Sequence, residues 1–186
     1  MRFRTFLVIA VAARCAVLAL AGFRVSRSGP KLKVSINMLA YGDAYAGSLW
    51  ESGLSRNDET AKLQVLIENE SNRPLDLFMD GCSWGDPTLA FVATTPDGKV
   101  HKLPSTPLEY LKNAPGFVRL QPGQTWVRDV FYNSTKWSEF RELISKAQAP
   151  LTLQAVLTQD PGSMTKKDPN LWSGSVASKA VSVAVR

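Results

Sequence analysis

Histidine and cysteine are scarce in this chain, and each shortage removes a class of chemistry. The single histidine, His101, excludes metal sites built from several histidines. Of the two cysteines, Cys15 lies in an apolar N-terminal stretch, which leaves Cys82 without a disulfide partner in the rest of the chain. We interpret Cys82 as a small buried side chain beneath its own turn, with a reactive thiol or an intermolecular bridge as the alternative.

Clustered positive charge is missing as well. The formal net charge is +6, but half of it comes from Arg2, Arg4 and Arg14 near the N-terminus. The other basic residues are scattered among acidic ones, which is not the pattern of a nucleic-acid-binding surface. No glycine-rich phosphate loop precedes a helical pattern, so the sequence gives no support for nucleotide or other cofactor binding.

The N-terminal stretch has the composition of an export signal. A basic start, Met1–Arg4, leads into Thr5–Ala21, which is apolar apart from Thr5 and Arg14. Ala19-Leu20-Ala21 places small residues where a signal peptidase cuts. No cysteine follows these small residues, which excludes a lipoprotein signal of the usual kind.

These features predict a signal peptide over residues 1–21, a linker over 22–30 and a single folded domain over 31–186. The protein is then secreted or periplasmic. The alternative is an uncleaved anchor that holds the protein at the membrane by residues 5–23. The basic residues that follow the apolar stretch weigh against both interpretations, since positive charge there disfavours translocation.

Short alternating runs, separated by Pro, Gly, Asn and Asp, fill the rest of the chain. Such runs with frequent turn signals are typical of an all-β sandwich. We predict an immunoglobulin-like antiparallel β-sandwich of seven to eight strands with one short helix. The predicted strands are Lys31–Leu39, Ala61–Glu68, Leu75–Met79, Leu89–Ala93, Lys99–Leu103, Thr125–Tyr132, Leu151–Leu157 and Ala180–Val185.

The stretch Arg73–Lys99 organises this pattern, since it contains two strands joined by an irregular link. Leu75, Leu77 and Met79 are expected on one face of the first strand. Trp84 in the link and Phe91 in the second strand are expected to be buried.

The short helix is predicted between Lys136 and Ala147. Its apolar residues recur at helical spacing, which is typical of an amphipathic helix packed on a core. These residues are Trp137, Phe140, Leu143, Ile144 and Ala147.

Several segments together resemble a family of uncharacterised exported bacterial proteins. They are "LQVLIENESNRPLDLFMDGCSWGDPTLAFVATTPDGKV", "LQPGQTWVRDVFY", "PLTLQAVL" and "LWSGSVASKAVSVAV", with a CSWG turn and a terminal W-[ST]-G-x-V-x-S motif. The chain is also distantly similar to the immunoglobulin-like fold of intracellular proteinase inhibitors. The resemblance implies a sandwich and an exported location, and it implies no activity.

Gly81-Cys82-Ser83-Trp84-Gly85 matches the G-x-S-x-G pattern of serine hydrolases. That pattern needs a helix after the serine, yet Asp86-Pro87 and a strand pattern follow here. We therefore attribute the match to glycines in a turn, and we predict that the protein is not an enzyme.

Asp76, Asp80 and Asp86 offer carboxylates in the same stretch. Their spacing matches no calcium loop, so we predict that they cap turns and that the chain has no metal site.

The long segment Ala40–Thr60 contains Tyr41, Tyr45 and Trp50 among glycines and polar residues. Aromatic residues in such a loop serve as anchors for a partner, although they also serve to cap a core. We predict a non-enzymatic binding or structural accessory module of the cell envelope, with an envelope protein or a cell-wall polysaccharide as partner. The alternative is a proteinase-inhibitor-like protein that uses an extended loop, either Ala40–Thr60 or Gln159–Asn170.

Overall fold

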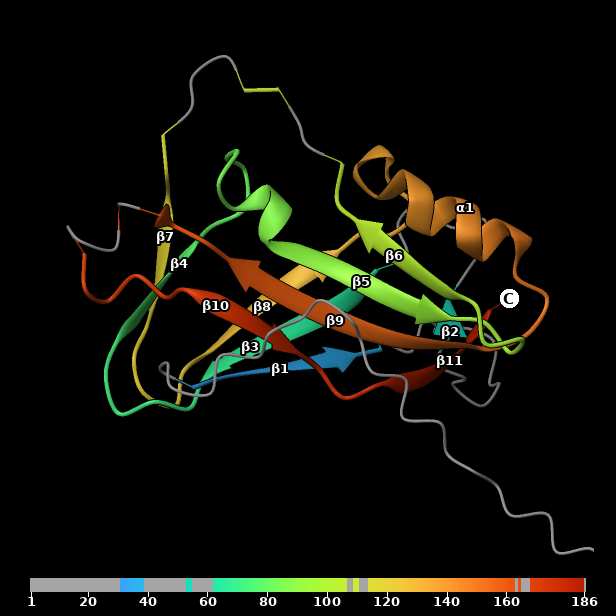
Figure 1. Cartoon of the computed structure of the whole chain (residues 1–186), viewed down its shortest axis with the longest axis horizontal. Coiled ribbons are helices and arrows are strands. Elements are labelled where there is room, and N and C mark those ends of the chain that lie inside the picture. Colours follow the sequence, from blue (N-terminus) through green and yellow to red (C-terminus); the bar gives the residue numbers. More distant parts are fainter. Residues whose placement is uncertain are drawn as a thin grey trace, which may run out of the picture.

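The computed structural model describes residues 31–38, 53–54, 62–106, 109–110, 114–162, 164 and 168–185, with the backbone alone for 53–54. This part of the chain is mostly strands in antiparallel sheets, with one short α-helix (Figure 1). The strands are β1 (Leu32–Asn37), β2 (Gly53–Leu54), β3 (Leu63–Asn69), β4 (Leu75–Phe78), β5 (Leu89–Thr94), β6 (Val100–Pro104), β7 (Phe117–Leu120), β8 (Thr125–Val130), β9 (Leu151–Gln159), β10 (Gly174–Ala177) and β11 (Val181–Val185). Helix α1 spans Ser138–Lys146, and the 3-10 turns η1 and η2 span Asp86–Thr88 and Thr135–Trp137. The all-β prediction with one short helix is confirmed.

One sheet has three antiparallel strands in the order β1-β3-β8. Apolar and polar residues alternate along it, because one face is buried and the other meets water. Leu63, Val65 and Ile67 of β3 have no exposed surface. On the outer face Lys33 of β1 lies opposite Glu68 of β3 and donates a hydrogen bond to it at 2.8 Å.

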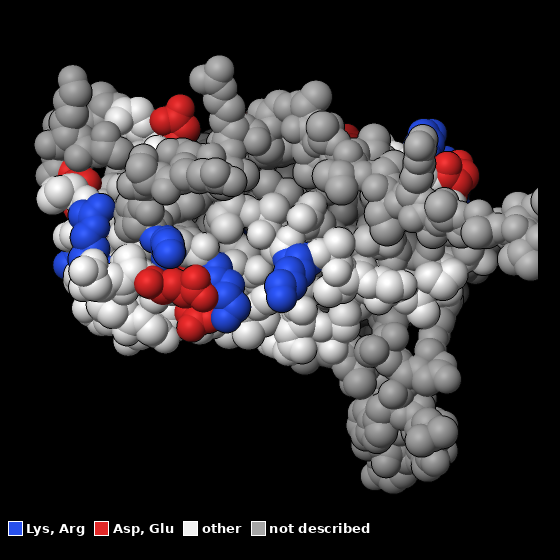
Figure 2. All heavy atoms as spheres, turned by 60° about the horizontal axis from the view of Figure 1, so that its bottom comes forward, with Lys and Arg blue, Asp and Glu red and all other residues white. Residues whose placement is uncertain are grey.

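Figure 2 brings forward the side of the molecule that lies at the bottom of Figure 1, where β1 runs. The coloured charges on this face are few and of both signs. Lys33 of β1 lies 2.8 Å from Glu68 and 3.8 Å from Glu70, so basic and acidic side chains are mixed. The described part of this face carries no large patch of one sign.

The larger sheet has the order β2-β11-β9-β5-β6, and β10 also pairs with β9. All of its pairs are antiparallel except that of β2 with β11. Its central strand β9 buries Leu151, Leu153, Ala155 and Leu157 on one face. A strand with neighbours on both edges and a buried face is well suited to anchor the core.

The buried faces of the two larger sheets belong to one hydrophobic cluster, and the sheets lie one behind the other in Figure 1. Helix α1 adds Phe140 and Ile144, which have no exposed surface, to this cluster. The ring of Phe91 on β5 lies 5.1 Å from that of Phe140 and 5.2 Å from that of Trp137. The predicted burial of Phe91 and the predicted helix are therefore confirmed.

Strands β10 and β11 both pair with β9, but their registers differ by one residue. Gly174 of β10 pairs with Gln159, whereas Val181 of β11 pairs with Leu153. The C-terminal segment therefore contains one residue more than the matching stretch of β9. Such an extra residue is a β-bulge, which bends a strand and changes the phase of its alternation.

Ser178 directly precedes the extra residue, at the edge of this bulge, and is 3% exposed. Its backbone N–H donates to the carbonyl of Ala155 at 2.8 Å, and its Oγ accepts from the N–H of Ala155 at 3.0 Å. The alternation predicted for Ala180–Val185 does not extend to the residues that precede the bulge. For this reason β10 was not predicted. Strands β2 and β7 were not predicted either, so the strands outnumber the seven to eight expected.

Strand β4 does not have the single buried face predicted for it. All four of its residues are buried, whereas Met79 is 43% exposed. The strand has neighbours on both edges, because it pairs with β7 and Asp76 also forms a bridge with Leu171. Phe78 packs against Phe117 with ring centroids 5.3 Å apart, which explains why the second face is covered as well.

The predicted burial of Trp84 is only partly correct, since its side chain is half-buried. Cys82 and Asp86 on either side of it are 4% and 1% exposed. These two residues point into the protein and hold the turn, which leaves Trp84 nearer the surface.

Candidate functional site

The three residues predicted to contact a partner, Tyr41, Tyr45 and Trp50, lie outside the described residues. Most of the segment Ala40–Thr60 and part of Gln159–Asn170 do so too. The structure brings together a different set of side chains, beginning at the turn after β4.

The turn Gly81–Asp86 has a shape that requires glycine at two positions. Gly81 has a φ of 85°, a left-handed conformation that other residues adopt at a cost. A Cβ on Gly85 would lie 1.8 Å from the carbonyl oxygen of Met79. The Sγ of Cys82 donates to the same carbonyl at 3.3 Å, and Cys82 is buried as predicted.

The surroundings of Ser83 differ from those of a hydrolase nucleophile. The turn is followed by η1 and then by β5, where the nucleophile elbow needs a helix. His101 lines a groove beneath α1 whose described walls do not include Ser83. Gly81 and Gly85, the two glycines of the G-x-S-x-G pattern, are explained by the shape of the turn.

Asp86 is buried at the end of the turn and joins three segments. Its carboxylate accepts hydrogen bonds from the N–H of Gly81 at 2.9 Å, from Lys136 Nζ at 2.8 Å and from the hydroxyl of Tyr110. Burial favours a higher pKa for Asp86, but the hydrogen bonds from Lys136, Tyr110 and Gly81 together keep that pKa below its ordinary value. The hydrogen bond to the Asp86 carboxylate raises the pKa of Tyr110 to about 12.

A second ion pair joins the buried Arg128 of β8 to the partly exposed Asp80. The guanidinium of Arg128, which is 4% exposed, donates through two nitrogens to the carboxylate of Asp80 and through Nη1 to Thr88 Oγ1 at 3.0 Å. The ring of Trp126 lies 5.1 Å from its Cζ. Burial lowers the pKa of Arg128, and the Asp80 carboxylate opposes this effect. A cavity of about 210 Å³ lies beside the pair. Its lining includes Arg128 and also Lys136, the lysine that pairs with Asp86.

Asp76, Asp80 and Asp86 do not converge on a common point. Each forms an ion pair with a cation from a different element, namely β7, β8 and η2. In the part of the chain that is described, no three His, Cys, Asp or Glu side chains are grouped closely enough to hold a metal ion.

The turn also links β6 to α1. The hydroxyl of Ser105, just after β6, donates to the carbonyl of Asp86 at 2.7 Å. The N–H of Thr106 donates to the carbonyl of Lys136 at 2.7 Å, and its hydroxyl lies 3.3 Å from that of Ser138. Hydrogen bonds therefore fix the end of β6 against the start of α1, at one end of the groove between them.

This groove consists of two adjoining hollows of about 530 and 570 Å³. They share four lining residues, Lys99, His101, Leu143 and Lys146. One hollow extends to Glu139 at the start of α1, and the other extends to Asp97 in the turn between β5 and β6. The size of each hollow lies within the range of small-ligand sites in proteins.

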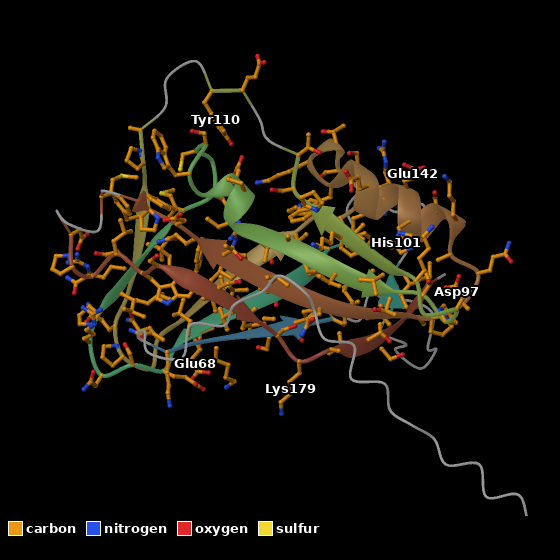
Figure 3. The ribbon with its side chains drawn as sticks, in the orientation of Figure 1. Glu68, Asp97, His101, Tyr110, Glu142 and Lys179 are labelled. Atoms are coloured by element: carbon orange, nitrogen blue, oxygen red, sulfur yellow. The ribbon has the colours of Figure 1, made fainter. Side chains whose placement is uncertain are left out.

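His101 lies on β6 beneath α1, and Figure 3 shows it across the groove from Glu142 of the helix. Its side chain is half-buried, and none of the described residues forms a hydrogen bond with its ring. The inward position of His101 could have been predicted from the alternation of β6. That alternation places His101 on the same face as Leu103, a residue only 3% exposed.

Comparisons with protein-family models, with curated proteins and with solved structures find no match to this chain. The family resemblance of the CSWG turn and the terminal motif therefore stays a prediction. None of the helices among the described residues is long and apolar enough to cross a bilayer.

Proposed function

We propose that this protein is a non-enzymatic binding module of the cell envelope, with an immunoglobulin-like sandwich fold, and that it holds its ligand between β6 and α1. The export signal predicted over residues 1–21 supports the location. Two sheets that share one core, antiparallel apart from the β2–β11 pair, support the sandwich.

The groove is the observation that carries the proposal. It is concave, it has the volume of a ligand site, and it contains a half-buried histidine whose ring has no described partner. One end of the groove is fixed by the hydrogen bonds around Asp86, so the site is largely formed before a ligand arrives. A preformed site loses less conformational entropy on binding.

The polar clusters outside the groove support a non-catalytic role. The carboxylates of Asp76, Asp80 and Asp86 are each neutralised by a lysine or an arginine. Side chains satisfied in this way hold the fold together, whereas a catalytic group needs to be aimed at a substrate.

The test is a nuclear magnetic resonance titration of the full chain with three probes: short peptides, oligomers of N-acetylglucosamine and a purified envelope protein. We expect at least one probe to shift the amide signals of His101 and Leu143. The variant Leu143→Arg, which places a long charged side chain in the groove, should abolish that shift. Lys179→Gln, an exposed change on the far side of the molecule in Figure 3, is the control and should bind normally.

The titration also separates the groove from the long loop. If binding survives Leu143→Arg but is lost when Tyr41, Tyr45 and Trp50 are all replaced by alanine, the site is the loop and the groove proposal is wrong. If none of the probes shifts the groove signals, the groove does not serve as the binding site.

A further inference from the structure

We infer that the groove takes a short peptide in extended conformation, about three residues long, with its free amino end at Glu139 and its free carboxyl end at Lys99. This inference rests on the proposed function, because it names the ligand of that site.

The direction of α1 against β6 sets the polarity of the groove. Thr106, just after β6, contacts Ser138 at the start of α1, so the helix begins where the strand ends. The other end of the helix lies near the start of β6, since Lys146 lines the same hollow as Pro96 and Lys99. Glu139 and Lys99 therefore lie toward opposite ends of the groove.

The other charged side chains of the groove are largely engaged with one another or with the backbone. Glu142 accepts a hydrogen bond from Lys146 at 2.5 Å. Asp97 accepts hydrogen bonds from the hydroxyl of Thr95 and from the N–H of Lys99 at 3.4 Å. Lys102 of β6 lines the same hollow as Glu139 and adds a positive charge there. This lysine also takes part in another interaction.

Glu139 remains as an acidic group for which the described residues provide no partner. The ammonium of Lys99 forms no ion pair within 4 Å with the described residues, although its charge helps to lower the pKa of Asp97. An acidic end and a basic end match a ligand that carries an ammonium and a carboxylate. Charge complementarity of this kind sets the orientation of a ligand more than its affinity.

The spacing of the two ends fits a tripeptide. Lys146, which lines both hollows together with Lys99, marks the basic end on the helix, and seven helical steps, or about 10 Å along the axis, separate it from Glu139. An extended chain spans about 3.4 Å per residue, so three residues cover about the same length. His101 lies between the two ends, and its ring nitrogens offer a donor or an acceptor to a peptide group.

The walls favour a peptide over a saccharide. Saccharide sites commonly present aromatic rings, but the described lining of this groove contains no Trp, Tyr or Phe. It contains Leu143, Ala147 and Val100, which provide an apolar surface for a central side chain.

The experiment measures binding of the tripeptide Ala-Leu-Ala to the full chain by calorimetry. The peptide is used with free ends, with an acetylated amino end and with an amidated carboxyl end. We expect each blocked form to bind about three to ten times more weakly than the free form, the usual effect of losing one partly exposed charge contact. Oligomers of N-acetylglucosamine should bind more weakly than the free tripeptide.

Variants assign each peptide end to one residue. Glu139→Gln should weaken the free peptide about as much as acetylation does, and it should have no further effect on the acetylated peptide. Lys99→Gln should show the same relation with the amidated peptide. Glu70→Gln and Lys179→Gln, both exposed and away from the groove, are the charge-matched controls.

The outcomes distinguish this inference from the proposed function. If blocked and free Ala-Leu-Ala bind equally, or if free Ala-Leu-Ala does not bind, the tripeptide inference is wrong. The proposed function still stands if a saccharide or a protein shifts the groove signals, and it fails together with the inference if nothing does.

Discussion

Lys136 Nζ lies 2.8 Å from a carboxylate oxygen of Asp86, fifty residues away in the chain, and the aspartate side chain is 1% exposed. The lysine lies in η2, the turn that leads into α1, and the aspartate ends the turn after β4. This ion pair therefore connects the irregular turn to the helix that forms one wall of the groove.

We expect Asp86→Asn to lower the free energy of unfolding by about 3 kcal/mol, because removing one partner of a buried pair leaves the other charge uncompensated. The measurement is urea unfolding at neutral pH. Glu68→Gln, which removes an exposed ion pair with Lys33, is the control and should have a much smaller effect. Equal losses for the two variants would contradict the structural role of Asp86.

Acid should destabilise the protein through Asp76 and Asp86. The pKa of Asp76 is lowered by its hydrogen bonds from Arg119, and that of Asp86 is lowered as described above. A lowered folded-state pKa contributes stability above the unfolded value of about 3.9 and loses it as the pH falls through the folded value. Unfolding measured by circular dichroism should therefore show a stability that begins to fall near pH 4 and continues to fall below it. Asp86→Asn should make this fall shallower, and an unchanged slope would rule out the contribution of Asp86.

Trp84 and Phe91 should differ in their effect on stability, since the first is half-buried and the second has no exposed surface. Phe91→Ala should cost about 3–5 kcal/mol, the usual range for a buried aromatic residue. Trp84→Ala should cost about 1–2 kcal/mol, because less of its surface is removed from water. Chemical denaturation of both variants tests the order, and a larger loss for Trp84 would be inconsistent with its partial exposure.

Ser178→Ala should cost about 1–3 kcal/mol, because the N–H of Ala155 then loses the acceptor that faces it in a buried bulge. Ser175→Ala on the neighbouring strand β10 is the matched control. Its hydroxyl contacts that of Thr158 at 2.9 Å at an exposed site, so its removal should matter little. Hydrogen exchange of the Ala155 amide should accelerate in the first variant alone.

The export signal predicts a mature N-terminus at Gly22, directly after Ala19-Leu20-Ala21. Intact-mass measurement of the protein made in its own host tests this position. Membrane-bound protein that retains Met1–Ala21 would instead support the uncleaved anchor.

Local patterns in the sequence were sufficient for most of the strands and for the helix. Alternation predicted β1, β3 and β9, and helical spacing predicted α1, because a buried face imposes a period of two or of 3.6 residues on the chain. The burial of Phe91 followed from the same reasoning, whereas that of Cys82 followed from the usual burial of a free cysteine.

Other features depended on contacts between distant segments. Strand β10 escaped prediction since the bulge just after Ser178 changes the phase of alternation, and that bulge is defined only by pairing with β9. Strand β4 is buried on both faces because Phe117 and Leu171 reach it from later parts of the chain.

The sequence alone determined that this is a chain of short strands with one amphipathic helix, since that information is contained in neighbouring residues. Only the tertiary structure decided which charges pair and where the groove lies. Asp86 meets Lys136, and His101 comes to lie beneath α1, because folding brings together residues whose separation in the chain carries no signal of their contact.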